Sequence, residues 1–280
     1  MAEGRFYLHL ISDATGTTLH GIARACLVQF EGAAPLEKFW NFIRTEEQLD
    51  QVIEGIAEAR GPVLFTLVDN ELRRKLRDAC AQMQVPCVSV LDPILRGLSQ
   101  YLGQASRNKP GGQYELNAAY FERIDAVDFA IHHDDGQSLD TIDEAEVILV
   151  GASRTSKTPT CFYLANRGIR AANIPLVPGI TVPPEAFTHK TPLYVGLVET
   201  PERLVELRRN RLKSGETLDH RVTSSTYLSV DAVDAEIKNA RKLFSSHGWP
   251  VIDVTRRSVE ETASEIMSMF NRHHPDRMLL

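Results

Sequence analysis

Apolar and polar positions along the first hundred residues follow two patterns that alternate. Short, nearly continuous apolar runs predict strands buried on both faces of a parallel sheet, and they lie at 6–12, 36–43, 62–68 and 86–91. Between them, apolar residues spaced three and four positions apart predict helices with one buried face. Thr45 and Gln48 have the spacing of a capping box, which marks the start of one of these helices. Four consecutive strand–helix units predict a doubly wound parallel sheet.

The second half of the chain repeats this pattern after a break. The Pro-Gly-Gly stretch within 108–112 predicts a loop, and a helix is expected over about 114–127. Predicted strands follow at 146–150, 173–177, 192–198 and 250–254, and predicted helices at 159–167, 201–213, 231–246 and from Ser258, which forms a capping box with Glu261. We place a domain boundary near Asp140. The predicted fold class is α/β, with an N-terminal Rossmann-like, doubly wound parallel-sheet domain (1–140) and a C-terminal phosphate-loop (P-loop) kinase-like α/β domain (141–280).

The segment after the strand at 146–150 has the spacing of a phosphate-binding loop, Gly-x₄-Gly-Lys-Ser/Thr, except that Ser156 stands where the second glycine is expected. In such loops the backbone N–H groups at the helix start face an anion, and the helix dipole favours negative charge there. Lys157 is placed to reach an outer phosphate, and the Thr158 hydroxyl to hold Mg²⁺. A simple turn is the alternative, but it has no use for the cation Arg154. The predicted nucleotide or phosphate site consists of Gly151, Ala152, Ser153, Arg154, Thr155, Ser156, Lys157 and Thr158.

Three further segments carry polar residues that suit phosphoryl transfer. Before Gly136, Asp134 or Asp135 can accept the proton of an attacking hydroxyl or hold the metal, whereas the alternative is a solvated Asp-Gly turn. Arg208 and Arg211 share one face of the helix at 201–213. They are candidates for a lid that neutralises the transferred group, and an exposed charged helix is the alternative. The segment 12–18 is either a second anion site or an ordinary threonine-rich helix start.

Composition narrows the classes of function. A formal net charge of −6 argues against general nucleic-acid binding, which needs a basic surface. No apolar stretch approaches the length of a membrane span, and no signal-peptide pattern precedes the first strand. The four cysteines lack Cys-x-x-Cys spacing, so neither a zinc site nor a disulfide framework is predicted. We expect a cytoplasmic protein with no membrane and no nucleic-acid partner.

Longer motifs carry a more specific signal. They are Tyr120-Phe121-x-Arg123-Ile124-x-Ala126-Val127-x-Phe129, His133-Asp134-Asp135-Gly136, Val150-Gly151-x-Ser153-Arg154-Thr155-Ser156-Lys157-Thr158-Pro159, Tyr163-Leu164-Ala165-Asn166-x-Gly168 and Asn173-x-Pro175-Leu176-Val177-Pro178-Gly179. Together with Ser12-Asp13-x-Thr15-Gly16, they resemble the pyruvate, phosphate dikinase / phosphoenolpyruvate synthase regulatory proteins. The resemblance covers nearly the whole chain and also accounts for Ser156, because that family carries Ser-Lys-Thr-Pro at this point.

The resemblance implies a bifunctional serine/threonine kinase and phosphorylase. Such proteins use ADP to phosphorylate a threonine beside the catalytic histidine of the dikinase, which inactivates it. They remove that phosphate by attack of inorganic phosphate, which releases pyrophosphate. Segments 166–168, 203–208 and 249–258 favour the dikinase as the target, and the synthase is the alternative target. We also expect Mg²⁺ and a homodimer. A small-molecule P-loop kinase and a non-catalytic nucleotide sensor are the alternatives from other classes.

Overall fold

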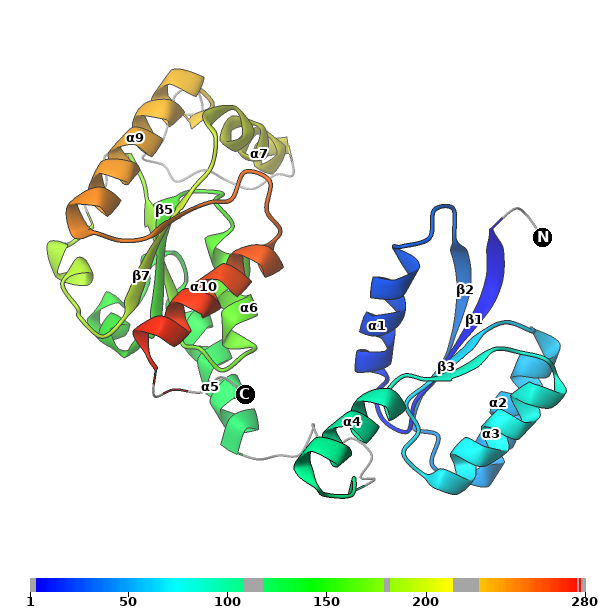
Figure 1. The fold of residues 1–280 in the computed structure, drawn as a ribbon. Helices are drawn as coiled ribbons and strands as arrows, with labels where there is room; N and C mark the ends of the chain where they lie inside the picture. The colour runs from blue at the N-terminus through cyan, green and yellow to red at the C-terminus, as the bar shows by residue number, and fades with distance from the viewer. Residues whose placement is uncertain (1–3, 108–117, 179–181, 214–226, 276, 278–280) are drawn as a thin grey trace. The chain divides into compact units, whose positions relative to one another are not determined.

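The chain forms two compact units, Met1–Glu115 (unit 1) and Leu116–Leu280 (unit 2), each with its own sheet and core (Figure 1). The computed structural model describes residues 4–107, 118–178, 182–213, 227–275 and 277. The division falls before helix α5 (Ala118–His132), whereas the sequence analysis placed the boundary near Asp140. Helix α5 belongs to unit 2 because its small residues pack against helix α6 (Lys157–Ala165) in one apolar cluster.

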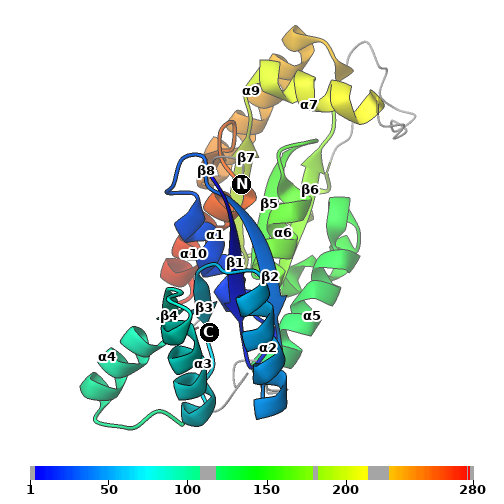
Figure 2. The same ribbon diagram turned by 90° about the vertical axis from the view of Figure 1, so that its right-hand side faces the viewer.

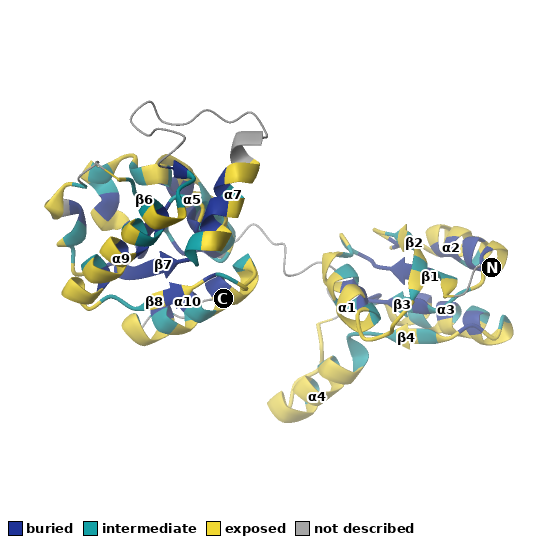
Figure 3. Cartoon of the chain, turned by 90° about the horizontal axis from the view of Figure 1, so that it is seen from above, coloured by how far each residue is buried: buried dark blue, intermediate teal, exposed yellow. Residues whose placement is uncertain are grey.

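Unit 1 is a parallel sheet with the strand order β2–β1–β3–β4. Its elements are β1 (Arg5–Ile11), α1 (Thr17–Leu27), β2 (Ala34–Trp40), α2 (Glu46–Glu58), β3 (Val63–Phe65), α3 (Asn70–Gln82), β4 (Cys87–Ser89) and α4 (Asp92–Leu102). Successive residues of a strand point to opposite faces. Leu8 and Leu10 therefore pack with α1, while Ile11 packs with α2 and α3. Helices on both faces confirm the doubly wound sheet, and Figure 3 shows buried residues gathered on the strands and inner helix faces.

Unit 2 repeats this strand order in a second parallel sheet, β6–β5–β7–β8 (Figure 2). Its strands are β5 (Val147–Ala152), β6 (Ala171–Leu176), β7 (Leu193–Val198) and β8 (Val251–Asp253), and its later helices are α7 (Pro201–Lys213), α9 (Val230–His247) and α10 (Val259–His273). Helices α6 and α10 cover one face of the sheet, and α9 covers the other. The sheet grows in opposite directions from β5 and β7. In such sheets, ligands bind outside the carboxyl ends of the strands at this switch in direction.

Local signals account for several details of this packing. Both predicted capping boxes are present, at the starts of α2 and α10. Gly196 of β7 leaves room for Phe244, because a Cβ at this glycine would lie 2.4 Å from the phenyl ring. Helix α9 therefore lies close against the sheet. In the part of the chain that the structure describes, no helix is long and apolar enough to cross a membrane.

Candidate phosphotransfer site

The predicted phosphate-binding segment connects β5 to α6 at the carboxyl end of the sheet. Only 153–156 form the loop, because β5 continues through Ala152 and α6 already begins at Lys157. Arg154 has a φ of 79° and Ser156 a φ of 59°, which is a left-handed conformation that residues other than glycine rarely adopt. Left-handed residues next to right-handed ones turn successive N–H groups toward one side and form an anion-binding concavity. Ser156 thus has the backbone conformation for which a glycine is usual at this position.

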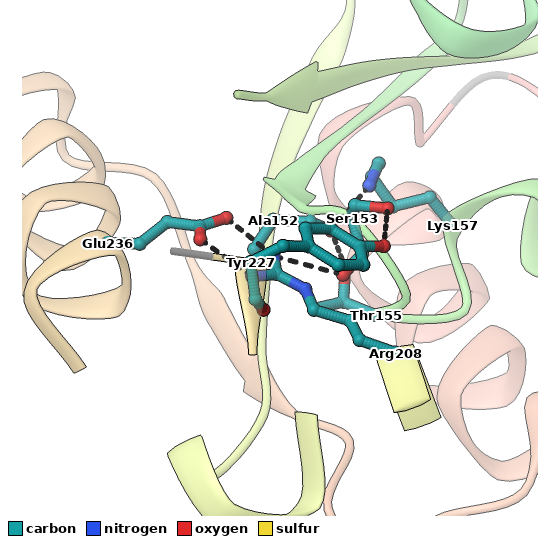
Figure 4. Close-up of polar contacts among 7 residues, drawn as sticks. All are labelled: Ala152, Ser153, Thr155, Lys157, Arg208, Tyr227 and Glu236. Carbon is teal, nitrogen blue, oxygen red and sulfur yellow. Dashed lines mark hydrogen bonds and ion pairs between the residues drawn. The ribbon is translucent and has the colours of Figure 1, made fainter. Parts of the chain in front are cut away.

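Lys157 is the buried cation of this loop. It is 5% exposed, and its Nζ donates a hydrogen bond of 2.7 Å to the carbonyl of Ala152 (Figure 4). Thr155 Oγ1 donates to the same carbonyl over 3.0 Å. Burial lowers the pKa of Lys157 from 10.5 to about 8, although neighbouring acidic groups, Asp135 foremost, act in the opposite direction. A bound phosphate would provide the counter-charge that favours the ammonium form.

The acidic turn and the loop meet at Asp134. The turn is a short 3₁₀ segment, Asp134–Gly136, and its first carboxylate accepts a hydrogen bond of 2.8 Å from Thr158 Oγ1. Asn173 Nδ2 of β6 donates to the same carboxylate oxygen, and its Oδ1 accepts a hydrogen bond of 3.1 Å from the backbone N–H of Asp135. The asparagine therefore fixes the turn against the start of α6.

The pair of Asp134 and Thr158 fits Mg²⁺. Mg²⁺ binds through one or two carboxylates together with substrate phosphates, and in P-loop enzymes through an aspartate and the loop Ser or Thr. No group of three or more His, Cys, Asp or Glu side chains suited to a metal ion occurs among the residues described. A site completed by phosphate oxygens is consistent with so few protein ligands.

Asp135 differs from Asp134 in its surroundings. Its backbone is left-handed, with a φ of 51°, and no side chain in the described ranges donates a hydrogen bond to its carboxylate. Its negative charge raises the pKa of Lys157 and so favours the ammonium form, against the larger effect of burial. The neighbouring His133 is buried and holds the turn, since Nδ1 donates to the Phe129 carbonyl over 2.9 Å and Nε2 lies 2.9 Å from Thr141 Oγ1.

Arg208 lies next to Ser153 of the loop and is buried. It is 2% exposed, and both terminal nitrogens bond to the carboxylate of Glu236 on α9. Figure 4 shows the guanidinium between Glu236, the ring of Tyr227 and the carbonyl of Ser153. The lid role predicted for Arg208 stays a prediction. Arg211 lies on α7, but its side chain is outside the described residues.

The chain matches a family model described as kinase/pyrophosphorylase over residues 8–267. It belongs to the kinase/pyrophosphorylase family. Relatives named pyruvate, phosphate dikinase regulatory protein include one from Paramagnetospirillum magneticum, 49% identical over 98% of this chain and 87% of the relative. Another, from Caulobacter vibrioides, is 49% identical over 95% of this chain and 83% of the relative. A third, from Bradyrhizobium diazoefficiens, is 48% identical over 97% of this chain and 96% of the relative. These findings confirm the resemblance seen in the sequence motifs.

The structure of this kinase/pyrophosphorylase adds residues that the sequence patterns did not single out as functional. Asn173 belongs to a family motif but carries no phosphotransfer pattern of its own, and no motif contains Tyr227 or Glu236. None of the three belongs to the loop itself, so no spacing within the loop motif marks it. The segment 12–18 lies after the first strand of unit 1, where the phosphate loop lies in unit 2. Its Ser12 and Asp13 bond to Thr66 and to the backbone of Val68.

Proposed function

We propose that this kinase/pyrophosphorylase catalyses two phosphotransfer reactions at one loop. In the first, a threonine of pyruvate, phosphate dikinase takes the β-phosphoryl group of ADP, which inactivates the dikinase and releases AMP. In the second, inorganic phosphate takes the phosphoryl group from the phosphothreonine, which restores the threonine and releases pyrophosphate. The meeting of Lys157, Thr158 and Asp134 at a left-handed loop carries the proposal. The names of the relatives support the dikinase as the target.

Asp135 is the residue we assign as the base of the forward reaction. Its carboxylate is not engaged by a donor of the described chain, whereas that of Asp134 is already bonded to Thr158 and Asn173. Asp135 takes the proton of the threonine hydroxyl while the hydroxyl oxygen bonds to the β-phosphorus. The bond from that phosphorus to the oxygen bridging the two phosphates breaks, and AMP leaves with the electron pair. Lys157 stabilises the negative charge on the phosphoryl oxygens during transfer.

The second reaction uses the same residues with a different nucleophile. An oxygen of inorganic phosphate bonds to the phosphorus of the phosphothreonine, and the bond from phosphorus to the threonine oxygen breaks. Asp135 takes the proton of the attacking hydrogen phosphate and passes it to that oxygen, and Lys157 again stabilises the phosphoryl group in transit. Asp134 and Thr158 would hold Mg²⁺, which when bound neutralises charge on the phosphate oxygens.

A label-transfer experiment tests the proposal. The protein is mixed with ADP labelled in its β-phosphate and with dikinase trapped as its phosphohistidine form. Acid-stable label on the dikinase is expected, and added phosphate should release it as labelled pyrophosphate. Label on phosphoenolpyruvate synthase alone would instead identify the synthase as the target. Turnover without a protein acceptor would indicate a small-molecule kinase, and nucleotide binding without any transfer would indicate a sensor.

The variant Lys157→Ala should abolish both reactions while the protein stays folded, because one ammonium serves both. Its folding is checked by circular dichroism and thermal unfolding. Loss of only one direction would mean two separate phosphate sites and would refute the single-loop mechanism.

A further inference from the structure

A buried ion pair lies beside the loop, and the phosphotransfer chemistry does not use it. Arg208 of α7 and Glu236 of α9 form a two-pronged contact, with 2.8 Å between Nη2 and Oε1 and 3.0 Å between Nη1 and Oε2. The two side chains are 2% and 7% exposed. The ring of Tyr227 stacks over the guanidinium, 4.4 Å from its central carbon. The loss of hydration offsets much of the attraction in such a pair, so stability alone is a weak reason for it.

The ion pair touches the loop at its first residue, Ser153. Arg208 Nη2 points to the Ser153 carbonyl at 3.4 Å, and the hydroxyl of Tyr227 lies 3.4 Å from Ser153 Oγ (Figure 4). On the other side, Lys157 and Thr155 hold the carbonyl of Ala152. Two successive peptide carbonyls at the entry to the loop are therefore held by side chains from two separate segments, the start of α6 with the residues just before it and α7.

The loop needs such support because its backbone is strained. Arg154 and Ser156 are both left-handed without being glycine. Strain of this kind persists only where the surroundings over-determine the conformation. The same left-handed turns direct the N–H groups toward an anion. A loop that relaxed at Ser156 would lose its anion-binding geometry.

We infer that Glu236 is a positioning residue for the phosphate-binding loop. It fixes the rotation of the Arg208 guanidinium, which holds the Ser153 carbonyl and keeps the loop in its anion-binding conformation. The ring of Tyr227 packs on the face of the same guanidinium. Both terminal nitrogens of Arg208 face protein acceptors, and its Nε is buried without a partner among the residues described. In this geometry the guanidinium of Arg208 acts on the loop through the Ser153 carbonyl.

Glu236→Gln tests the inference against a matched control. The variant loses the charge that orients Arg208. The apparent KM for ADP and for phosphate should each rise about tenfold, because a tenfold change in affinity corresponds to the strain energy that one left-handed residue loses when the loop relaxes. The change in kcat should be smaller, because the loop binds phosphate in the ground state as well as in the transition state. Glu206→Gln removes the same charge from the exposed pair of Arg203 and Glu206 and should change neither constant.

Two further variants separate positioning from stability. Removing one partner of a buried pair can unfold a protein, whereas replacing both by apolar residues of similar volume is often neutral. Arg208→Met/Glu236→Leu should therefore fold and still show the raised KM. Ser156→Gly in this background lets the loop adopt its left-handed turn without strain and should restore most of the phosphate affinity. An apolar pair with wild-type KM, or no recovery with the glycine, would overturn the inference.

The inference rests on the proposed function for its choice of ADP and phosphate as ligands. A readout that is independent of activity tests the inference separately. Hydrogen exchange of the amides at 153–157 should be faster in Glu236→Gln and in the apolar pair than in wild type or Glu206→Gln. If the wild-type protein transfers no phosphoryl group, the proposed function fails, and exchange alone decides the inference. Equal exchange rates at the loop in all four proteins would then overturn it.

Discussion

Replacing Lys157 with methionine should abolish function and at the same time stabilise the fold. Burial lowers the pKa of this side chain from 10.5 to about 8, so keeping it charged in the folded protein at pH 7 costs about 3 kcal/mol. The lost hydrogen bond to Ala152 offsets about 1 kcal/mol of the gain. Its carbonyl stays satisfied, because Thr155 still donates to it. We therefore expect the free energy of unfolding of unit 2 to rise by about 2 kcal/mol, with both phosphotransfer reactions lost.

The pH dependence of this gain follows from the sign of the shift. The pKa is lower in the folded protein than in the unfolded chain, so the unfolded chain binds more protons between about pH 8 and 10.5. The destabilisation by Lys157 is complete below pH 8 and disappears as the pH rises toward 10.5. The advantage of Lys157→Met should therefore shrink over that range.

Urea unfolding provides the assay. In a Trp40→Phe background, fluorescence of Trp249 reports on unit 2 alone, and the free energy of unfolding is compared at pH 7 and pH 9.5 without nucleotide. Activity is measured by label transfer from ADP. A variant that is less stable at pH 7, or that gains equally at both pH values, would refute the idea that Lys157 is held charged against burial.

Three other predictions concern the acidic turn, the core of unit 1 and the role of unit 1. Asp135→Asn should lower the transfer rate about a hundredfold to ten-thousandfold, whereas Asp134→Asn should mainly raise the Mg²⁺ concentration needed for half-maximal rate. If Asp135→Asn and Asp134→Asn both keep nearly the full transfer rate, the turn is only structural. Burial lowers the pKa of His9, whose Nδ1 accepts a hydrogen bond from Trp40. Unit 1 should therefore lose stability as pH falls below about 6.5, and a flat profile of Trp40-monitored unfolding between pH 7.5 and 5 would contradict this. A chain of residues 116–280 should bind ADP but not phosphorylate the dikinase, and normal transfer by the soluble fragment would exclude a docking role for unit 1.

The sequence by itself determined the architecture, because that part of the information is local. Strand and helix periods, together with the capping boxes at Thr45 and Ser258, predicted two parallel α/β sheets, and both are present. The strand–loop–helix at 147–165 was also readable, since its elements and the glycine–lysine spacing are contiguous in the chain. The bounds moved by two residues at the loop. Hydrogen bonding to β6 and β7 extends β5, and the left-handed Ser156 lets α6 begin at Lys157.

Only the tertiary structure decided which polar side chains are buried and what they hold. In sequence, Arg208 is one of several arginines on a charged helix, and Glu236 is one acid on an amphipathic one. Both become buried because α7 and α9 pack together over the end of the sheet, and they meet although they lie 28 positions apart. Asp134 likewise meets Thr158 of α6 and Asn173 of β6 only in the folded unit. A charged residue is exposed or buried according to the surface it finds after packing, and no local pattern carries that information.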